Sequence, residues 1–174
     1  MDDPESDDRR LTHLDDAGRA RMVDVGDKPV TRRRAVAEGT IRMSPDTLRA
    51  IRDQELRKGD ALTVARLAAI GGAKRTPDLI PLCHPLPLDA VEVTIDPVEA
   101  SKGQEGLPGL RVRVGASTWS RTGVEMEALC GVTAGLLALY DMAKSRDRGM
   151  RIEDVRLLEK SGGRSGRWTR DEDG

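Results

Sequence analysis

Hydrophobic and polar positions alternate along three stretches of the chain with the period of a half-buried β-strand. The first alternation covers residues 35–43, the second covers 91–95, and the third starts over 110–114. The polar segment EASKGQEGLPG, residues 99–109, separates the last two, so we expect a hairpin-type connection between antiparallel strands. A last, short strand is expected over residues 155–158, ahead of the segment KSGGRSG.

Two helices are predicted between the first and second strands. Ser44 followed by Pro45 supplies an N-cap and a first helical residue, so the first helix should cover about residues 45–57. Asp60 can cap the second helix, which should end near the next Gly-Gly pair or a turn later. The segment DLIPLCHPLP follows and is expected as a rigid loop, because proline fixes φ and removes a backbone donor.

A longer helix is predicted between the third and last strands. Thr122 and Glu125 match a capping box, and the apolar run after them should continue as a helix to about Ser145. The alanines and glycines of this run permit close packing. The element order β-α-α-β-β-α-β predicts an α+β fold, a ferredoxin-like antiparallel sheet packed against helices, with an added helix.

The chain is about one domain long, at 174 residues, but its core material is unusual. Phenylalanine is absent and aromatic residues make up 2% of the chain, so the interior must consist of Val, Leu, Ile, Ala and Met. Such a core is thin, which favours association with other subunits. Charge and glycine content predict a disordered tail over residues 1–10, a single catalytic domain over 11–160 and a flexible glycine-rich tail over 161–174.

The charge balance limits the classes of partner. Lys and Arg number 29 against 30 Asp and Glu, a net charge of −1, which argues against a general nucleic-acid or membrane binder. We find no apolar signal segment and no long apolar span. The two cysteines, Cys83 and Cys130, then fit reduced thiols, and we expect a cytoplasmic protein.

Cys83 and His84 lie side by side in the proline-rich loop, and two interpretations stay open. They can be a packed thiol and a surface imidazole, or the prolines can hold His84 toward a ligand as a rigid donor or acid/base group. Adjacent side chains point apart in extended backbone, and no CxxC or HExxH spacing is present. A metal site and a thiol nucleophile are therefore both disfavoured.

Several cations are candidates for phosphate contacts, but each also has an ordinary structural explanation. Lys58 and Lys74 fall where helices are expected to end, and positive charge is favourable there. Lys160 and Arg164 belong to KSGGRSG, which lacks the order of a Walker motif. That segment can be a solvated tail or a mobile flap over a phosphate.

Four charged residues of the long helix are further candidates. Glu125 is explained by the capping box, whereas Glu127 precedes a run without charge that lasts until Asp141. Asp141 and Lys144 are three residues apart and can be a surface ion pair, or Asp141 can be a partly buried carboxylate with a tunable pKa. Glu127 and Asp141 are about 21 Å apart along a helix. If both are catalytic, the site should lie between two subunits.

Six segments resemble, in order, the motifs of the MoaC family of molybdenum cofactor biosynthesis. They are LTHLDDAGRARMVDVGDKPVTRRRAVAEG, KGD, AKRTPDLIPLCHPLPL, RTGVEMEAL, LYDMAK and VRLLEKSGGRSG. The resemblance implies a ferredoxin-like α+β fold and a homo-hexamer built from dimers, with the site at the dimer interface. It also implies a lyase that converts (8S)-3′,8-cyclo-7,8-dihydroguanosine 5′-triphosphate to cyclic pyranopterin monophosphate and diphosphate.

The resemblance also implies functional residues, matched motif by motif. The catalytic set is Lys58, His84, Asp141 and Lys144. The substrate-binding set is Leu82, Cys83, His84, Glu125, Met126, Glu127 and Lys74. Asp141 is expected as the principal acid/base group, and the lysines should match charge on the departing diphosphate. The sequence requires no cofactor and no protein-bound metal, and magnesium is compatible with the triphosphate.

Three other functions stay open. RNA-binding modules share the ferredoxin-like plan, but they stack bases on aromatic side chains of the sheet, and here Trp119 and Trp168 are isolated. An inactive family member could serve as an assembly partner, which the retained charged residues argue against. A phosphohydrolase acting on ordinary nucleotides would be distinguished by phosphate release from GTP.

Overall fold

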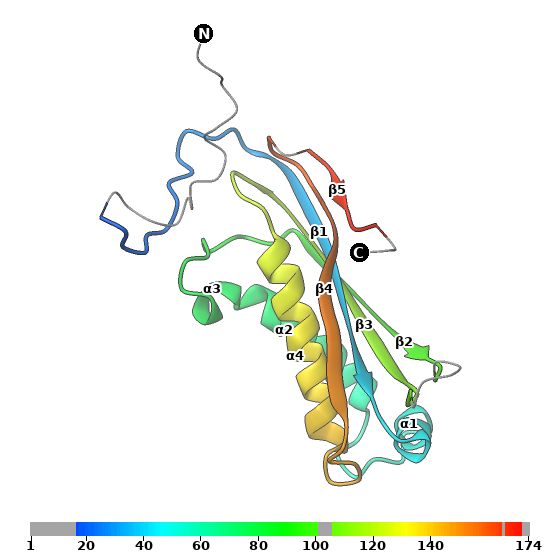
Figure 1. Cartoon of the computed structure of the whole chain (residues 1–174). Helices are drawn as coiled ribbons and strands as arrows, with labels where there is room; N and C mark the ends of the chain where they lie inside the picture. The colour runs from blue at the N-terminus through cyan, green and yellow to red at the C-terminus, as the bar shows by residue number, and fades with distance from the viewer. Residues whose placement is uncertain (1–16, 101–105, 165, 172–174) are drawn as a thin grey trace.

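The computed structural model describes residues 17–100, 106–164 and 166–171, and within them an open antiparallel sheet carries its helices on one face (Figure 1). The strands are β1 Thr31–Arg42, β2 Ala90–Val98, β3 Gly109–Ser120, β4 Arg151–Ser161 and β5 Trp168–Thr169, in the order β2-β3-β1-β4-β5. The helices are α1 Pro45–Arg52, α2 Ala61–Lys74, α3 Thr76–Leu79 and α4 Glu125–Ala143. The predicted α+β, ferredoxin-like fold is confirmed.

β1 is a central strand that is buried on both faces, whereas the alternation predicted a half-buried one. It pairs antiparallel with β3 over its whole length and with β4 on its other side. Val36, Glu38 and Thr40 point away from the helices but are still buried. Alternation correctly separates the two faces of β1. It could not indicate that arginine side chains of neighbouring strands cover the second face.

α2 and α4 pack closely because small residues face each other. Ala65, Ala69 and Ala73 form a fully buried row on α2. On α4, a Cβ added to Gly131 would lie 3.0 Å from a Val114 methyl group and 3.1 Å from the Ala69 carbonyl oxygen. The predicted role of small residues in close packing is therefore confirmed.

Among the described residues, one helix, α4, has the length and the apolar composition that a membrane span would need. The expectation that the chain has no long apolar span is therefore wrong for this segment. α4 packs against α2, β1 and β3 and contributes several of the fully buried core side chains. We interpret it as the core helix of the domain.

The first helix is shorter than predicted, because α1 ends at Arg52. The chain leaves the helix through Gln54, whose φ of 58° lies in the left-handed region. Lys58 consequently lies in the turn before α2, followed by Gly59 with a φ of 92°. The explanation of Lys58 as a helix-end cation is therefore wrong. α2 begins as predicted behind Asp60, whose carboxylate accepts backbone hydrogen bonds from the first turn.

The predicted capping box at the start of α4 is wrong. The helix begins at Glu125, and Val124 occupies the N-cap position without a side-chain hydrogen bond. The Thr122 amide instead donates to Ser120 Oγ at 3.3 Å. Glu125 is thus the first helical residue, where its carboxylate is not committed to capping.

The sheet extends further toward the C-terminus than predicted. β4 runs well beyond the expected residues 155–158, and its register against β1 shifts twice. β5 pairs with Glu159 and Lys160, and it falls within the segment predicted as a flexible tail, residues 161–174. A two-residue strand is too short for alternation to reveal. The predicted disordered tail over residues 1–10 lies outside the described residues.

Candidate functional site

The proline-rich loop and the first turn of α4 line a pocket of about 520 Å³, here called the carboxyl pocket. Its lining includes the predicted residues Leu82, Cys83, His84, Glu125, Met126 and Glu127. Inside the loop the Cys83 amide donates to the Ile80 carbonyl at 3.0 Å and forms a turn. Thr118 Oγ1 of β3 donates to the Pro87 carbonyl at 2.5 Å and fixes the C-terminal end of the loop. Six of the predicted substrate-binding residues therefore share one pocket.

Two acidic groups of the carboxyl pocket have raised pKa values. Glu127 is only 3% exposed, and its burial raises the pKa of its carboxyl, with the Glu125 charge acting in the same direction. Burial also raises the pKa of the Cys83 thiol, and Glu127 adds to this effect. Glu127 can therefore carry a proton closer to neutral pH than an ordinary glutamate, whereas Cys83 is held as a neutral thiol.

A second pocket, of about 480 Å³, adjoins the carboxyl pocket and is here called the cationic pocket. The two share the lining residues Lys28, Thr122, Gly123 and Glu125. The cations of the second pocket are Lys28, Arg33, Arg34, Arg121, Lys160 and Arg164. Lys160 Nζ lies 3.2 Å from Glu125 Oε1, so an ion pair joins the KSGGRSG segment to the start of α4.

Arg33 is fixed on the wall of the cationic pocket by main-chain carbonyls. Its Nε donates to Ser120 at 3.2 Å and its Nη2 to Arg121 at 3.1 Å. The backbone of Gly163, with a φ of 74°, passes so close to this guanidinium that a Cβ would collide with it. Sequence reasoning missed Lys28, Arg33, Arg34 and Arg121. Three consecutive arginines in β1 do not reveal which of them line a pocket, and no local pattern singles out Lys28 or Arg121.

Three further predicted residues form a separate charged cluster. Lys58 Nζ lies 2.7 Å from Asp141 Oδ2 and 2.8 Å from the Asp141 carbonyl oxygen, and Lys144 Nζ lies 2.7 Å from Asp141 Oδ1. The hydrogen bonds and charges of Lys144 and Lys58 lower the pKa of Asp141 to about 2, and Asp141 in turn raises the pKa of Lys144. Asp141 is exposed and ionised, so the alternative of a partly buried carboxylate is wrong for this chain.

The predicted site residues thus occupy three places on one chain. Glu127 is in the first turn of α4 and Asp141 is in its last part, about 21 Å away along the helix. Lys74 lies in neither cluster and lines a shallow hollow between α2 and α4. Its role in substrate binding stays a prediction.

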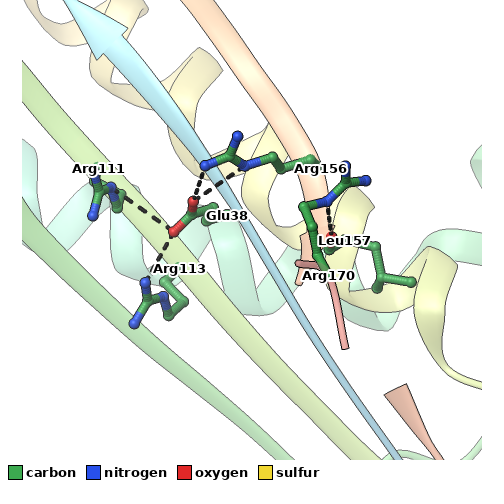
Figure 2. A network of polar contacts seen from close by, with 6 residues as sticks. All are labelled: Glu38, Arg111, Arg113, Arg156, Leu157 and Arg170. Atoms are coloured by element: carbon green, nitrogen blue, oxygen red, sulfur yellow. Dashed lines mark hydrogen bonds and ion pairs between the residues drawn. The ribbon is translucent and has the colours of Figure 1, made fainter. Parts of the chain in front are cut away.

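A further charged network lies on the sheet face away from the helices (Figure 2). Glu38 accepts from Arg113 Nη2 at 2.9 Å and from Arg156 Nη2 at 3.0 Å, and Arg111 Nε lies 3.8 Å away. Burial raises the pKa of Glu38, but the hydrogen bonds from Arg113 and Arg156 and the nearby charges outweigh it and lower the pKa. The sequence analysis did not predict this network. The hydrophobic alternation of β1 indicated that the Glu38 side chain faces solvent.

No group of three or more His, Cys, Asp or Glu side chains that could hold a metal ion occurs in the part of the chain that the structure describes. The fold and the pockets define a ferredoxin-like α+β protein with a cationic pocket beside a buried carboxyl group, that of Glu127.

Comparison with known proteins agrees with this architecture. The model of the MoaC family matches residues 22–163. The cyclic pyranopterin monophosphate synthase of Methylobacterium sp. (strain 4-46) is 56% identical over 161 residues, which cover 92% of this chain and 97% of that protein. The chain belongs to the MoaC family, and the predicted family membership is confirmed.

Proposed function

We propose that the chain is a cyclic pyranopterin monophosphate synthase, a lyase of molybdenum cofactor biosynthesis. It converts (8S)-3′,8-cyclo-7,8-dihydroguanosine 5′-triphosphate to cyclic pyranopterin monophosphate and diphosphate. The identity of 56% to the named relative, over nearly all of both chains, supports this activity. The structural observation that carries the proposal is the cationic pocket adjoining a pocket with an imidazole and two carboxyl groups.

The cationic pocket suits the triphosphate. Forming the cyclic phosphate requires a new P–O bond to the α-phosphorus, while the bond between the α- and β-phosphates breaks and diphosphate departs. Negative charge then develops on the leaving oxygens, and fixed guanidinium and ammonium groups stabilise that charge. Arg33, held by two carbonyls, and Lys160, paired with Glu125, are suitably placed groups of this kind.

The carboxyl pocket suits the rearrangement of the purine and ribose parts. This rearrangement needs protons delivered and removed at several ring atoms, and a carboxyl group with a raised pKa can do both near neutral pH. Burial raises the pKa of Glu127 above its ordinary value, and His84 lines the same pocket. We assign the main acid/base role to Glu127, in place of Asp141, which the sequence analysis favoured.

Asp141 has a different role in this proposal. Its pKa of about 2 makes it a poor proton donor at neutral pH, but its carboxylate fixes both Lys58 and Lys144. The two lysines are then positioned to contact phosphate oxygens. Because this cluster is far from Glu127 on one chain, a complete site takes Glu127 and His84 from one subunit and Lys58 and Asp141 from another. The family resemblance implies a homo-hexamer built from dimers, and each dimer would provide such a pairing.

The proposal includes no resident cofactor or metal. Lysine and arginine side chains can balance the triphosphate charge, and magnesium would arrive with the substrate's phosphates. A cytoplasmic location is also part of the proposal, and the unpaired state of Cys83 and Cys130 is consistent with it.

The direct test is anaerobic incubation of the purified protein with the cyclised dihydro-GTP substrate. We expect diphosphate release, a product with the mass of cyclic pyranopterin monophosphate and, after oxidation, pterin fluorescence. GTP serves as the control substrate. Phosphate release from GTP without pterin formation would support the phosphohydrolase alternative, and no turnover of either compound by folded protein would support an inactive assembly partner.

A further inference from the structure

β4 contains an extra residue within its pairing to β1. Ala37 of β1 pairs with Leu157. The residue before Ala37 pairs with Glu159, so Leu158 is the extra residue of a β-bulge. Bulges re-aim side chains and are frequent beside active sites. Two positions after this bulge residue comes Lys160, which lines the cationic pocket.

The bulge determines the face of the sheet on which Lys160 lies. Leu157 packs against the core, and Lys160 contacts Glu125 of α4, so both side chains are on the helix face. Leu158 and Glu159, between them, line a hollow on the opposite face, beside the network of Figure 2. A regular strand alternates its faces residue by residue, so two consecutive residues on one face are the consequence of the extra residue.

A regular ladder would change the charge in the cationic pocket. Without the bulge, every later residue of β4 would move by one position against β1. Glu159 would then take the place opposite Ala35 that Lys160 has now, and Lys160 would turn to the outer face. A carboxylate would replace an ammonium group beside Arg33 and Glu125, and the pocket would lose part of the positive charge that stabilises phosphate oxygens.

Arg170 holds the bulge from the side of β5. Its amide donates to the Leu158 carbonyl at 2.8 Å, and its Nε donates to the Leu157 carbonyl at 2.9 Å (Figure 2). The Trp168 ring supports the same side chain, with the guanidinium carbon 5.8 Å from the ring centroid. Trp168 also pairs with Lys160. Arg170 therefore binds both carbonyls at the point where the register shifts.

We propose that Arg170 is a positioning residue, which clamps the bulge at Leu158 and keeps Lys160 turned into the cationic pocket. Arg170 lines the hollow on the outer face, so it acts through Lys160 and not on the substrate. The inference rests on the proposed function, because that function gives Lys160 its contact with phosphate oxygens. It adds a residue from the segment that the sequence analysis treated as a flexible tail.

Substitution of Arg170 should reproduce the kinetic effect of losing Lys160. We expect Arg170→Ala to lower kcat/KM for the cyclised dihydro-GTP substrate by roughly 10-fold or more, divided between kcat and KM as in Lys160→Ala. The double variant should match Lys160→Ala alone within about twofold, because the two residues act through one contact. Additive losses in this double-mutant cycle overturn the inference.

Arg167→Ala is the matched control. Arg167 belongs to the same C-terminal segment, is exposed, and lies 3.4 Å from the Glu159 carboxylate through its Nη2. Its loss should keep kcat/KM within about twofold of the wild-type value. Urea unfolding of each variant verifies that the chain is folded under the assay conditions.

Deletion of Leu158 provides a rescue that a purely structural role of Arg170 would not allow. Without the extra residue, Lys160 keeps its place opposite Ala35 in a regular ladder, and no bulge has to be held. In a chain with Arg170→Ala, the deletion should restore kcat/KM to within about threefold of the wild-type value. If the deletion alone is tolerated but the combined variant stays impaired, Arg170 does not act through the bulge and the inference fails.

Acetylation of Lys160 reports on its position without any turnover. The ion pair with Glu125 shields the amine. Arg170→Ala should therefore raise the rate at which acetic anhydride modifies Lys160 by about threefold or more, measured by mass spectrometry, whereas Arg167→Ala should not.

The outcomes separate this inference from the proposed function. If wild-type protein forms cyclic pyranopterin monophosphate and Arg170→Ala keeps the wild-type kcat/KM and acetylation rate, the positioning inference fails and the function stands. If wild-type protein makes no product, but acetylation of Lys160 rises in Arg170→Ala and not in Arg167→Ala, the positioning of Lys160 is supported and the proposed function fails.

Discussion

Lys58 and Asp141 are 83 residues apart in the chain, yet the lysine ammonium contacts both the carboxylate and the main-chain carbonyl of Asp141, at 2.7 and 2.8 Å. The turn before α2 is thereby tied to the C-terminal part of α4. Lys144 binds the other carboxylate oxygen, so one anion positions two cations. This geometry favours a positioning role for Asp141, and it makes the role testable.

Asp141→Asn should lower turnover by about 100-fold or more, because the lysines lose the charge that fixes them. The shape of the pH profile of kcat should not change above pH 4, since a group with a pKa of about 2 does not titrate there. The measurement is kcat of the wild-type protein and of Asp141→Asn, from steady-state kinetics between pH 5 and 9. Loss of an acidic limb in Asp141→Asn would instead assign proton transfer to Asp141.

Glu127→Gln should reduce turnover by about 10²- to 10⁴-fold if Glu127 is the principal acid/base group. Diphosphate release, followed from pH 5 to 9, is the measurement. Glu125→Gln is the matched control on the same turn of α4, and we expect a smaller loss. Near-normal turnover of Glu127→Gln would refute the assignment.

Glu127→Gln should also stabilise the fold at neutral pH. The folded-state pKa of Glu127 is raised above its ordinary value of 4.5, so ionisation costs more in the folded chain than in the unfolded chain. The stability of wild-type protein should fall as pH rises from 4.5 through the folded-state pKa, and the variant should escape this loss. Urea unfolding at pH 4.5 and pH 7.5 should show the advantage only at the higher pH.

Glu38→Gln should lower the free energy of unfolding by about 1–3 kcal/mol at pH 7, because three guanidinium groups lose a buried counter-charge. The pKa of Glu38 is lowered, so its contribution is full above the ordinary value of 4.5 and is lost as pH falls through the folded-state value. Glu92→Gln, at an exposed carboxylate 3.6 Å from Arg34, is the control and should cost at most about 0.5 kcal/mol. Equal effects would indicate that the network is not cooperative.

Cys83→Ser should retain turnover within about threefold, since a thiol with a raised pKa is not a nucleophile at neutral pH. Labelling of the wild-type thiol by iodoacetamide should correspondingly be slow. Complete inactivation of a folded Cys83→Ser protein would revive a covalent mechanism.

Mixed oligomers of Lys58→Ala and His84→Ala chains should recover activity. Each parent variant is expected to be inactive, but a mixed dimer with composite sites contains one site with both native residues. Random pairing of equal amounts would restore about a quarter of the wild-type sites. No recovery in oligomers whose mixing is verified by mass spectrometry would place Lys58 and His84 of one chain in the same site.

Much of the fold could be predicted from alternation and capping signals. Asp60 marked the start of α2 correctly, and the small residues of α4 indicated close helix packing. The Thr122 capping box failed because sequence spacing matched a motif whose backbone the chain does not adopt. The sequence analysis missed β5, because a strand of two residues is too short to show a hydrophobic alternation.

The candidate site could be predicted only in part. The rigid loop and the charges of α4 pointed to His84 and Glu127, which the fold brings into one pocket. The contact between Lys58 and Asp141 depends on tertiary structure, and no local pattern encodes it. Arg33 was missed for the same reason, because its direction is set by the sheet register and by the Ser120 and Arg121 carbonyls at the end of β3.

The position of the aromatic residues has a practical consequence for spectroscopy. The chain has two tryptophans, one tyrosine and no phenylalanine. Trp119 is 62% exposed, and Trp168 lies near the sheet edge with the Arg170 guanidinium 5.8 Å from its ring centroid. The buried core therefore contains no indole, whereas Tyr140 packs against it. Tryptophan emission will consequently report on the outer sheet and on its edge at β5, and tyrosine emission is the intrinsic signal that reports on the core.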